Sequence, residues 1–186
     1  MTPKIFLDTE GVAFPHTVLD ARAGVLHPRG CYVMASEDIS TPMLSPALFE
    51  NVRQCCTIAT DQMNESHFEE AQTLLDEVYR LLPEPKTQWN AAGWILLALA
   101  ENAVRAQNYP EAVAALQDAV YAPGTIGNPW VHLRFGQATL ETRDEQRAAN
   151  ELIRAFMGGG RDIFSEVDPK YFLFLQSVAK PPQGGW

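Results

Sequence analysis

The sequence is short of cysteine, of basic residues and of long apolar runs. Its three cysteines, Cys31, Cys55 and Cys56, are an odd number with an adjacent pair, which is not a disulfide framework. No C-x-x-C spacing occurs and no histidine lies near the pair, so a zinc site is not predicted. A run of about 18 apolar residues, the minimum for a transmembrane helix, is also missing. We therefore expect free thiols and no membrane span.

Acidic residues outnumber basic ones, 23 against 14, which gives a formal net charge of -9. A field of that sign repels phosphate backbones, so we expect no nucleic-acid partner and consider a basic protein the better candidate. Acidity that serves solubility alone is the simpler alternative, and it stays open. Asp8 interrupts the apolar start of the chain, where a signal peptide needs a continuous apolar region, so we expect a cytoplasmic location.

Familiar catalytic and ligand-binding motifs are missing as well. The sequence has no G-x-S-x-G, no P-loop and no H-E-x-x-H. The run 158–160 is three glycines, but no strand is expected before it and no Lys-Ser/Thr follows, so we interpret it as a helix stop. The histidines are scattered, and we expect His132 to be packed rather than to bind a ligand. We predict no metal site and no cofactor.

One acidic pair near the start of the chain needs separate treatment. Asp8 and Glu10 flank one residue, and the segment 6–11 resembles the first metal-binding motif of DEDD-type exonucleases. Such an enzyme needs further aspartates on a mixed α/β domain, whereas the remaining chain has a helical pattern. A solvent-exposed turn after a short strand is the simpler interpretation. We therefore predict that the protein is not an enzyme.

A pattern of side chains occurs three times in the middle of the chain. A small residue, Ala71, Ala112 or Ala148, is followed by apolar residues four and seven positions later, and the three alanines lie 41 and then 36 residues apart. An aromatic residue precedes the alanine by three positions in the first two copies, and Glu145 stands there in the third. The preceding segments repeat at the same two offsets, with a large residue before a small one at 58–59, 99–100 and 135–136. Small residues at both places let paired helices approach closely.

Proline and glycine separate the repeated segments and define their ends. Asn128-Pro129 and Asp168-Pro169 have the chemistry of helix starts, because asparagine or aspartate caps a helix and proline suits its first turn. The predicted helices are 46–64, 67–81, 88–106, 109–121, 129–142, 145–157 and 169–179.

The sequence thus predicts an all-α protein with three parts. Residues 45–179 form a domain of tandem helix–turn–helix repeats, and the helix 169–179 caps its last repeat. Residues 1–44, rich in Gly and Pro, form an extended arm, with a short hairpin at 31–34, that packs on the repeats. Residues 180–186 form a flexible tail.

The three units resemble tetratricopeptide repeats over residues 52–160; the usual length of that repeat is about 34 residues. The match departs from the family pattern at the turn between paired helices, where the usual glycine is Ser66, Gln107 or Arg143. The usual tryptophan of the first helix is also replaced, by Cys55, Leu96 and His132. The resemblance implies a short right-handed superhelix whose inner face is lined by the first helix of each pair.

Two segments carry a narrower resemblance. Residues 127–137 (GNPWVHLRFGQ) and 155–172 are similar to segments of bacterial tetratricopeptide proteins from polymorphic-toxin and Rhs-type loci. That resemblance implies a cytoplasmic immunity protein, which binds a toxin domain and blocks it. A chaperone or adaptor for a secreted protein is the alternative, because short acidic tetratricopeptide proteins serve type III secretion in this way. The oligomeric state stays open.

In the register of this family, four positions of each first helix face inward. They are Arg53, Cys56, Thr60, Met63, Trp94, Leu97, Glu101, Val104, Trp130, Leu133, Gln137 and Leu140. Trp94 and Trp130 occupy the same repeat position, where either they anchor a partner or the arm covers them. Glu101 and Glu141 suit a basic toxin domain, although acids at 141–145 equally suit a solvated turn. The predicted partner-binding residues are Arg53, Trp94, Glu101, Trp130, Arg134, Gln137 and Glu141.

Overall fold

The computed structural model describes residues 44–123, 125–181 and 186, and all of its regular elements in these ranges are helices. The all-α prediction is confirmed there, and the helix ends lie within two residues of the predicted ones. The helices are α1 (Pro46–Asn64), α2 (Phe68–Arg80), α3 (Asn90–Arg105), α4 (Tyr109–Ala119), α5 (Pro129–Glu141), α6 (Glu145–Gly159) and α7 (Pro169–Val178), with short 3-10 helices η1 (Lys86–Gln88) and η2 (Asp162–Phe164). The predicted arm and hairpin lie outside the described residues, apart from Leu44.

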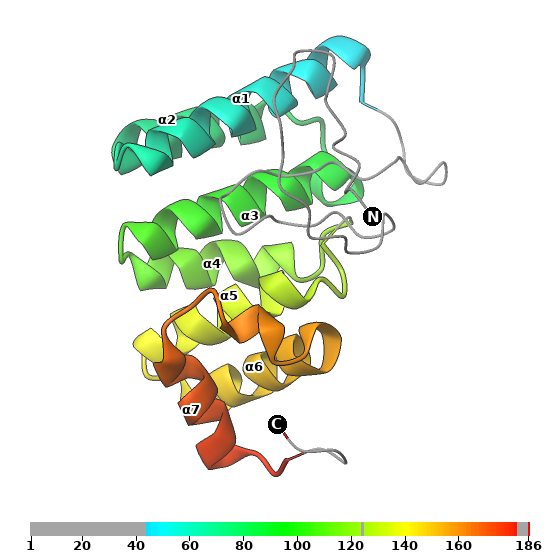
Figure 1. The fold of residues 1–186 in the computed structure, drawn as a ribbon. Coiled ribbons are helices and arrows are strands. Elements are labelled where there is room, and N and C mark those ends of the chain that lie inside the picture. The colour runs from blue at the N-terminus through cyan, green and yellow to red at the C-terminus, as the bar shows by residue number, and fades with distance from the viewer. Residues whose placement is uncertain (1–43, 124, 182–185) are drawn as a thin grey trace, which may run out of the picture.

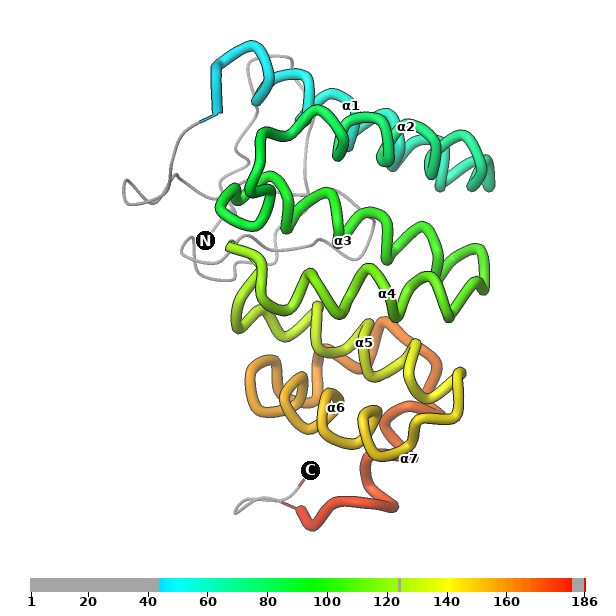
Figure 2. Tube along the Cα trace, turned by 180° about the vertical axis from the view of Figure 1, so that it is seen from behind, coloured from blue at the N-terminus to red at the C-terminus, as the bar shows by residue number. Residues whose placement is uncertain are grey.

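The helices form three antiparallel pairs in a row, α1 with α2, α3 with α4 and α5 with α6 (Figures 1 and 2). Neighbouring pairs contact each other through α2 and α3 and through α4 and α5. The first helices of the pairs also contact one another, because α3 touches both α1 and α5. α7 packs on α6 at the end of the row. No helix of the described ranges is long and apolar enough to cross a bilayer.

Capping residues explain where several helices begin. The side chains of Ser45, Asn128 and Asp168 each accept a hydrogen bond from a backbone N–H of the first turn, and each is followed by proline. This arrangement satisfies a donor that has no partner within the helix, while proline supplies a fixed φ at a position that needs no donor. The helix starts predicted at Asn128-Pro129 and Asp168-Pro169 are confirmed.

The turns inside the three pairs are built alike. Ser66, Gln107 and Arg143 have φ of 66°, 58° and 66°, so a residue other than glycine takes the left-handed conformation in all three. In each turn the next residue donates its N–H to the carbonyl five positions earlier: His67 to Gln62 (2.8 Å), Asn108 to Ala103 (2.8 Å) and Asp144 to Thr139 (2.9 Å). This is the Schellman motif of helix C-termini. The turns lie 41 and 36 residues apart, so the backbone recurs at the offsets of the side-chain pattern.

Two hydrophobic cores lie along the row. The alanine-rich core comprises the buried apolar side chains of α1–α4, Leu82 and Ala122 from the segments after α2 and α4, and Val131, Phe135 and Ala138 of α5. The aromatic core comprises Trp130, Leu133, Leu152, Ala155, Ile163, Phe164, Tyr171 and Leu175. α5 therefore contributes one side to each core. Close approach is visible at Gly136 of α5, where an added Cβ would lie 2.5 Å from Cγ of Leu152.

Candidate functional site

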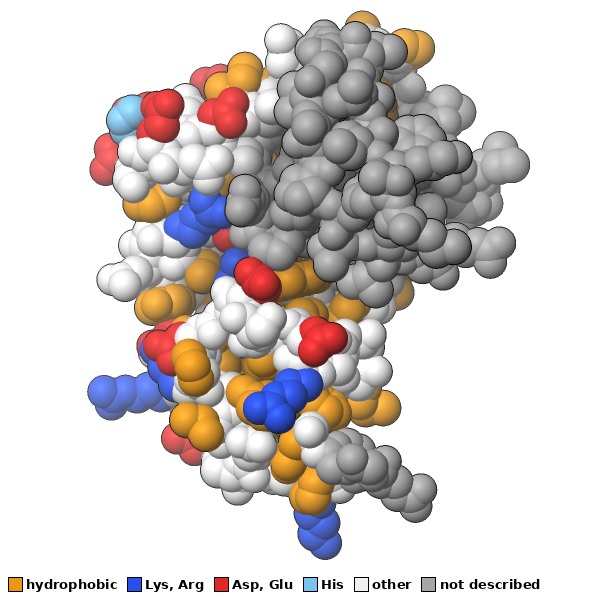
Figure 3. Space-filling view, viewed as in Figure 1, with side chains coloured by type: hydrophobic (Ala, Val, Ile, Leu, Met, Phe, Trp, Pro, Cys, Tyr) orange, Lys and Arg blue, Asp and Glu red, His pale blue; other side chains and the backbone are white. Residues whose placement is uncertain are grey.

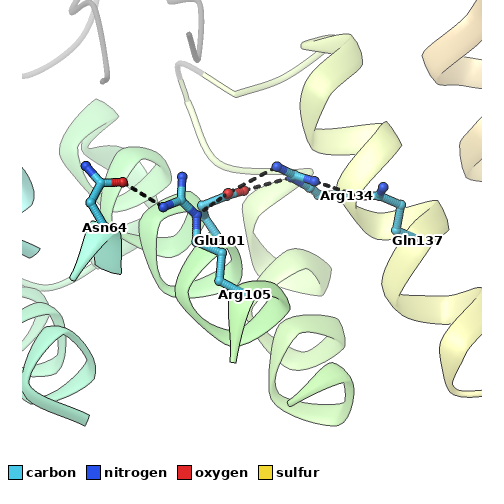
Figure 4. Close-up of polar contacts among 5 residues, drawn as sticks. All are labelled: Asn64, Glu101, Arg105, Arg134 and Gln137. Atoms are coloured by element: carbon cyan, nitrogen blue, oxygen red, sulfur yellow. Dashed lines mark hydrogen bonds and ion pairs between the residues drawn. The ribbon is translucent and has the colours of Figure 1, made fainter. Parts of the chain in front are cut away.

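Polar side chains from the first helices of all three pairs meet in one network (Figure 4). Glu101 of α3 is its centre, with a side chain only 4% exposed. Arg105 Nε donates to Glu101 Oε1 at 2.8 Å, and Arg134 Nη2 of α5 donates to the same oxygen at 3.0 Å. Arg134 Nε lies 2.7 Å from Glu101 Oε2, which completes a two-point ion pair. One buried carboxylate thus holds two guanidinium groups in place.

The network continues to both sides of Glu101. Arg105 Nη1 donates to Asn64 Oδ1 at the end of α1, and Arg134 Nη1 donates to Gln137 Oε1 one turn further along α5, both at 2.9 Å. We call these five residues, Asn64, Glu101, Arg105, Arg134 and Gln137, the Glu101 network. It connects α1, α3 and α5 through side-chain hydrogen bonds.

The arginines keep part of their surface exposed. The side chains of Arg105 and Arg134 are 24% and 15% exposed, while Glu101 is buried behind them. Two guanidinium groups against one carboxylate leave one formal positive charge on this part of an acidic protein. Because a buried charge without its partner is costly, Glu101 fixes the positions of the two arginines and with them the relation of α3 to α5.

The two tryptophans of the matching repeat position differ in the structure. Trp130 is 9% exposed and belongs to the aromatic core, with the guanidinium of Arg134 at 5.8 Å from its ring centroid. Trp94 is half-buried and contacts the ring of Phe49 of α1 edge-on, with centroids 6.0 Å apart. Trp130 therefore packs against Arg134 of the Glu101 network, whereas Trp94 retains a partly accessible ring.

The remaining predicted site residues lie apart from the network. Arg53 is exposed on α1 and pairs with Glu50 of the same helix, at 2.7 Å between Nη2 and Oε1. Glu141, at the end of α5, accepts a hydrogen bond from the hydroxyl of Tyr171 at 2.9 Å and lies 2.6 Å from Nζ of Lys170. Of the seven predicted residues, the structure thus brings together Glu101, Arg134, Gln137 and, through Arg134, Trp130. Sequence reasoning missed Asn64 and Arg105, although Arg105 lies four residues after Glu101 and forms a common helical ion pair with it.

Glu141, Lys170 and Tyr171 form a second polar group, the Glu141 clasp, which joins α5 to α7. Burial is the main cause that raises the pKa of Tyr171 to about 12, and its bond to Glu141 adds to this. The hydrogen bond to Glu141 also raises the pKa of the Lys170 ammonium above its usual range. Both shifts favour the protonated side chains, so the clasp is intact at neutral pH.

His132 and the two cysteines of the helical domain are packed. Nδ1 of His132 lies 2.7 Å from Oε2 of Glu151, between α5 and α6, in agreement with the expected packed side chain. Burial raises the pKa of the Cys56 thiol to about 12 and also raises that of Cys55, so both favour the thiol form. In the described ranges, no three His, Cys, Asp or Glu side chains are grouped as a metal site.

No family model matches the chain, and no curated protein matches it in sequence. The Glu101 network holds two partly exposed guanidinium groups in fixed positions. These groups lie on helices that contact one another, so their spacing is set by helix packing rather than by loops. On the face drawn in Figure 3, Lys and Arg side chains reach the surface beside apolar side chains.

Proposed function

We propose that this is a protein-binding module of the tetratricopeptide type. In this proposal the three pairs form a short right-handed superhelix, and α7 caps the last pair. The turns at Ser66, Gln107 and Arg143 share one backbone conformation and lie 41 and 36 residues apart, which supports the repeat assignment. The contact of α7 with α6 supports its role as a cap.

The observation that carries the proposal is the Glu101 network on the first helices. A binding face needs groups that are fixed before the partner arrives, because ordering them on binding costs free energy. Arg105 and Arg134 meet this need, since each is held by Glu101 and by an amide oxygen. Trp94, Val104 and Leu140 are half-buried residues of the same inner positions and would supply apolar contacts. We call this surface of α1, α3 and α5 the inner face.

The partner that we propose is a folded bacterial toxin domain, which the protein binds and neutralises in the cytoplasm. This step depends on the resemblance of residues 127–137 and 155–172 to proteins of toxin loci. The net charge of -9 would accelerate the encounter with a basic domain. An adaptor for a secreted protein is the second candidate. The half-buried Val104 and Leu140 favour it, because an extended segment docks apolar side chains along such a surface.

Co-expression with the product of the adjacent gene tests the proposal. We expect the protein to restore growth that the toxin suppresses and to elute with it in size-exclusion chromatography. Val104→Arg places a long charged side chain on the inner face and should abolish both effects. Gln117→Arg adds the same side chain to the exposed surface of α4 and should leave both unchanged. Neither rescue nor a complex would contradict the immunity function.

Truncation of the partner separates the two candidate functions. An immunity protein should bind the isolated folded toxin domain, whereas an adaptor should bind an extended segment outside that domain. Equal loss of binding for Val104→Arg and Gln117→Arg, with both variants folded, would contradict the inner face as the binding surface in either case.

A further inference from the structure

Three phenylalanines meet at the end of the row that carries α7. Phe156 of α6, Phe164 of η2 and Phe172 of α7 form an aromatic patch in which each ring contacts the other two. Their centroids are 5.1 Å apart for Phe164 and Phe172, 6.2 Å for Phe156 and Phe172 and 6.4 Å for Phe156 and Phe164. Phe164 is buried, while Phe156 and Phe172 are half-buried. The patch thus has a filled base and two partly accessible rings.

Trp186 lies against these two accessible rings. Its centroid is 5.2 Å from that of Phe156 and 5.9 Å from that of Phe172, with interplanar angles of 77° and 83°. Both contacts are edge-to-face, the arrangement that the charge distribution of aromatic rings favours. One indole therefore contacts two different helices, α6 and α7, at the same time. Figures 1 and 2 both show the C-terminal end of the chain near α6.

The composition of the segment after α7 explains why one ring carries the contact. Residues 180–185 are Lys-Pro-Pro-Gln-Gly-Gly, which offers no large apolar side chain besides Trp186 and cannot continue a helix. Arg161 adds a polar border to the patch, with its guanidinium 5.4 Å from the centroid of Phe172. An apolar base, two accessible rings and a cationic edge suit an electron-rich indole.

We propose that the aromatic patch is a docking site for a tryptophan side chain carried on an extended segment, and that Trp186 of the same chain occupies it. The bound indole fixes the end of α7 against α6. A free segment that carries a tryptophan competes for the same rings. This site is separate from the inner face, so it stands or fails independently of the proposed function.

A peptide of residues 180–186, titrated in trans against the full-length Trp186→Ser variant, tests the proposal. Because tethering through a short linker provides an effective concentration of about 1 mM, the titration extends into the millimolar range. In two-dimensional NMR spectra we expect shifts of the backbone amides around Phe156, Phe164 and Phe172. The wild-type protein, whose own indole fills the site, should show at least tenfold weaker binding. A control peptide with serine in place of tryptophan should not bind.

Equal binding to wild type and variant, or no binding to the folded variant, would overturn the proposal. A concentration-dependent dimer of the wild type that Trp186→Ser abolishes would overturn occupation within one chain, because it would place the indole on a second copy.

The wild-type protein offers a second measurement that does not depend on the folding of Trp186→Ser. Ring currents from Phe156 and Phe172 should displace the indole N–H resonance of Trp186 from its position in an unstructured peptide. Phe172→Leu keeps an apolar side chain but removes one ring, so it should move the resonance toward the unstructured position. An indole resonance that is unstructured in the wild type would contradict docking.

Discussion

The alanine-rich core of α1–α4 and the aromatic core of α5–α7 pack their helices with side chains of different size. In the first core, buried alanines such as Ala59, Ala71, Ala100 and Ala112 bring the helix backbones close together. In the second core, the large side chains Phe164 and Tyr171 come from η2 and α7, outside the three pairs, and pack with Trp130 of α5. The comparison shows two different demands on side-chain volume. Where the paired helices approach closely only small side chains fit, whereas at the end of the row large side chains are needed to fill the core.

The buried polar groups also differ between these two regions. The Glu101 network links neighbouring pairs through α1, α3 and α5, whereas His132 and Glu151 link α5 and α6 inside one pair. Arg147 borders this second group, with its guanidinium 4.5 Å from the ring centroid of Phe135. The first arrangement fixes the inner face, while the second supports the packing of the last pair.

The strongest test of the comparison uses two leucines at the same repeat position. Leu116 and Leu152 are both fully buried. Leu152 packs against Gly136 of α5, whereas the matching position of α3 is Ala100. We expect Leu152→Ala to lower the free energy of unfolding by about 3 to 4 kcal/mol and Leu116→Ala by about 2 to 3, because no methyl group borders the cavity at Gly136. Urea denaturation measures both.

A double substitution sharpens this test. Gly136→Ala alone should destabilise by about 1 to 3 kcal/mol, since its Cβ would overlap Leu152. In the Leu152→Ala background the new methyl group enters vacated space, so the double variant should be more stable than the sum predicts by at least about 1 kcal/mol. Strict additivity would show that the two residues are not in close contact.

Removing the centre of the polar network should have the next largest effect. Glu101→Gln leaves two arginines without a counter-charge, and we expect the free energy of unfolding to fall by about 2 to 3 kcal/mol, allowing for the partial exposure of the arginines. The matched control, Glu50→Gln, removes an exposed carboxylate paired with Arg53 and should leave the urea midpoint unchanged. Equal effects of the two substitutions would contradict a structural role for the network.

Glycine substitutions in the three turns should raise the stability of the protein rather than lower it. Ser66→Gly, Gln107→Gly and Arg143→Gly each place glycine at a positive φ, and each should stabilise the protein by about 1 kcal/mol. Glu65→Gly, at a φ of -89°, is the control and should destabilise it. Melting temperatures followed by circular dichroism report the difference. Stabilisation at only one of the three turns would show that they are not equivalent.

The smallest expected effect concerns the Glu141 clasp at alkaline pH. The pKa of Tyr171 is raised to about 12 in the folded protein, against about 10 in an unfolded chain. The stability that this shift supplies is therefore complete below pH 10 and is lost as the pH rises toward 12. Tyr171→Phe lacks this contribution, so its urea midpoint should approach that of the wild type between pH 9 and 11.5. A constant difference would contradict the assignment.

The sequence was sufficient to predict the helices, because proline, glycine and capping residues mark their ends and the apolar pattern has the helical period. It also located the three turns, where Ser66, Gln107 and Arg143 replace the expected glycine. Glu101, Arg134 and Gln137 were predicted as site residues, but the bond of Arg105 to Asn64 joins residues 41 positions apart and leaves no local signal.

Other contacts could not be predicted because nothing in the periodic pattern specifies them. Glu141 was assigned to a partner or to a solvated turn, whereas the structure pairs it with Lys170 and Tyr171 of α7. Residues 180–186 were predicted to form a flexible tail, and this stays a prediction. The contact of the Trp186 indole with the aromatic patch was not predicted. Both contacts depend on where the non-repeating α7 is placed.

Hydrogen exchange of the complex with the product of the adjacent gene tests the central claim most directly. If the inner face binds the partner, backbone amides of 94–105 and 130–141 should exchange more slowly in the complex, while those of 68–80 and 109–119 should be unchanged. Protection of α2 and α4 with no change in α3 and α5 would contradict the account.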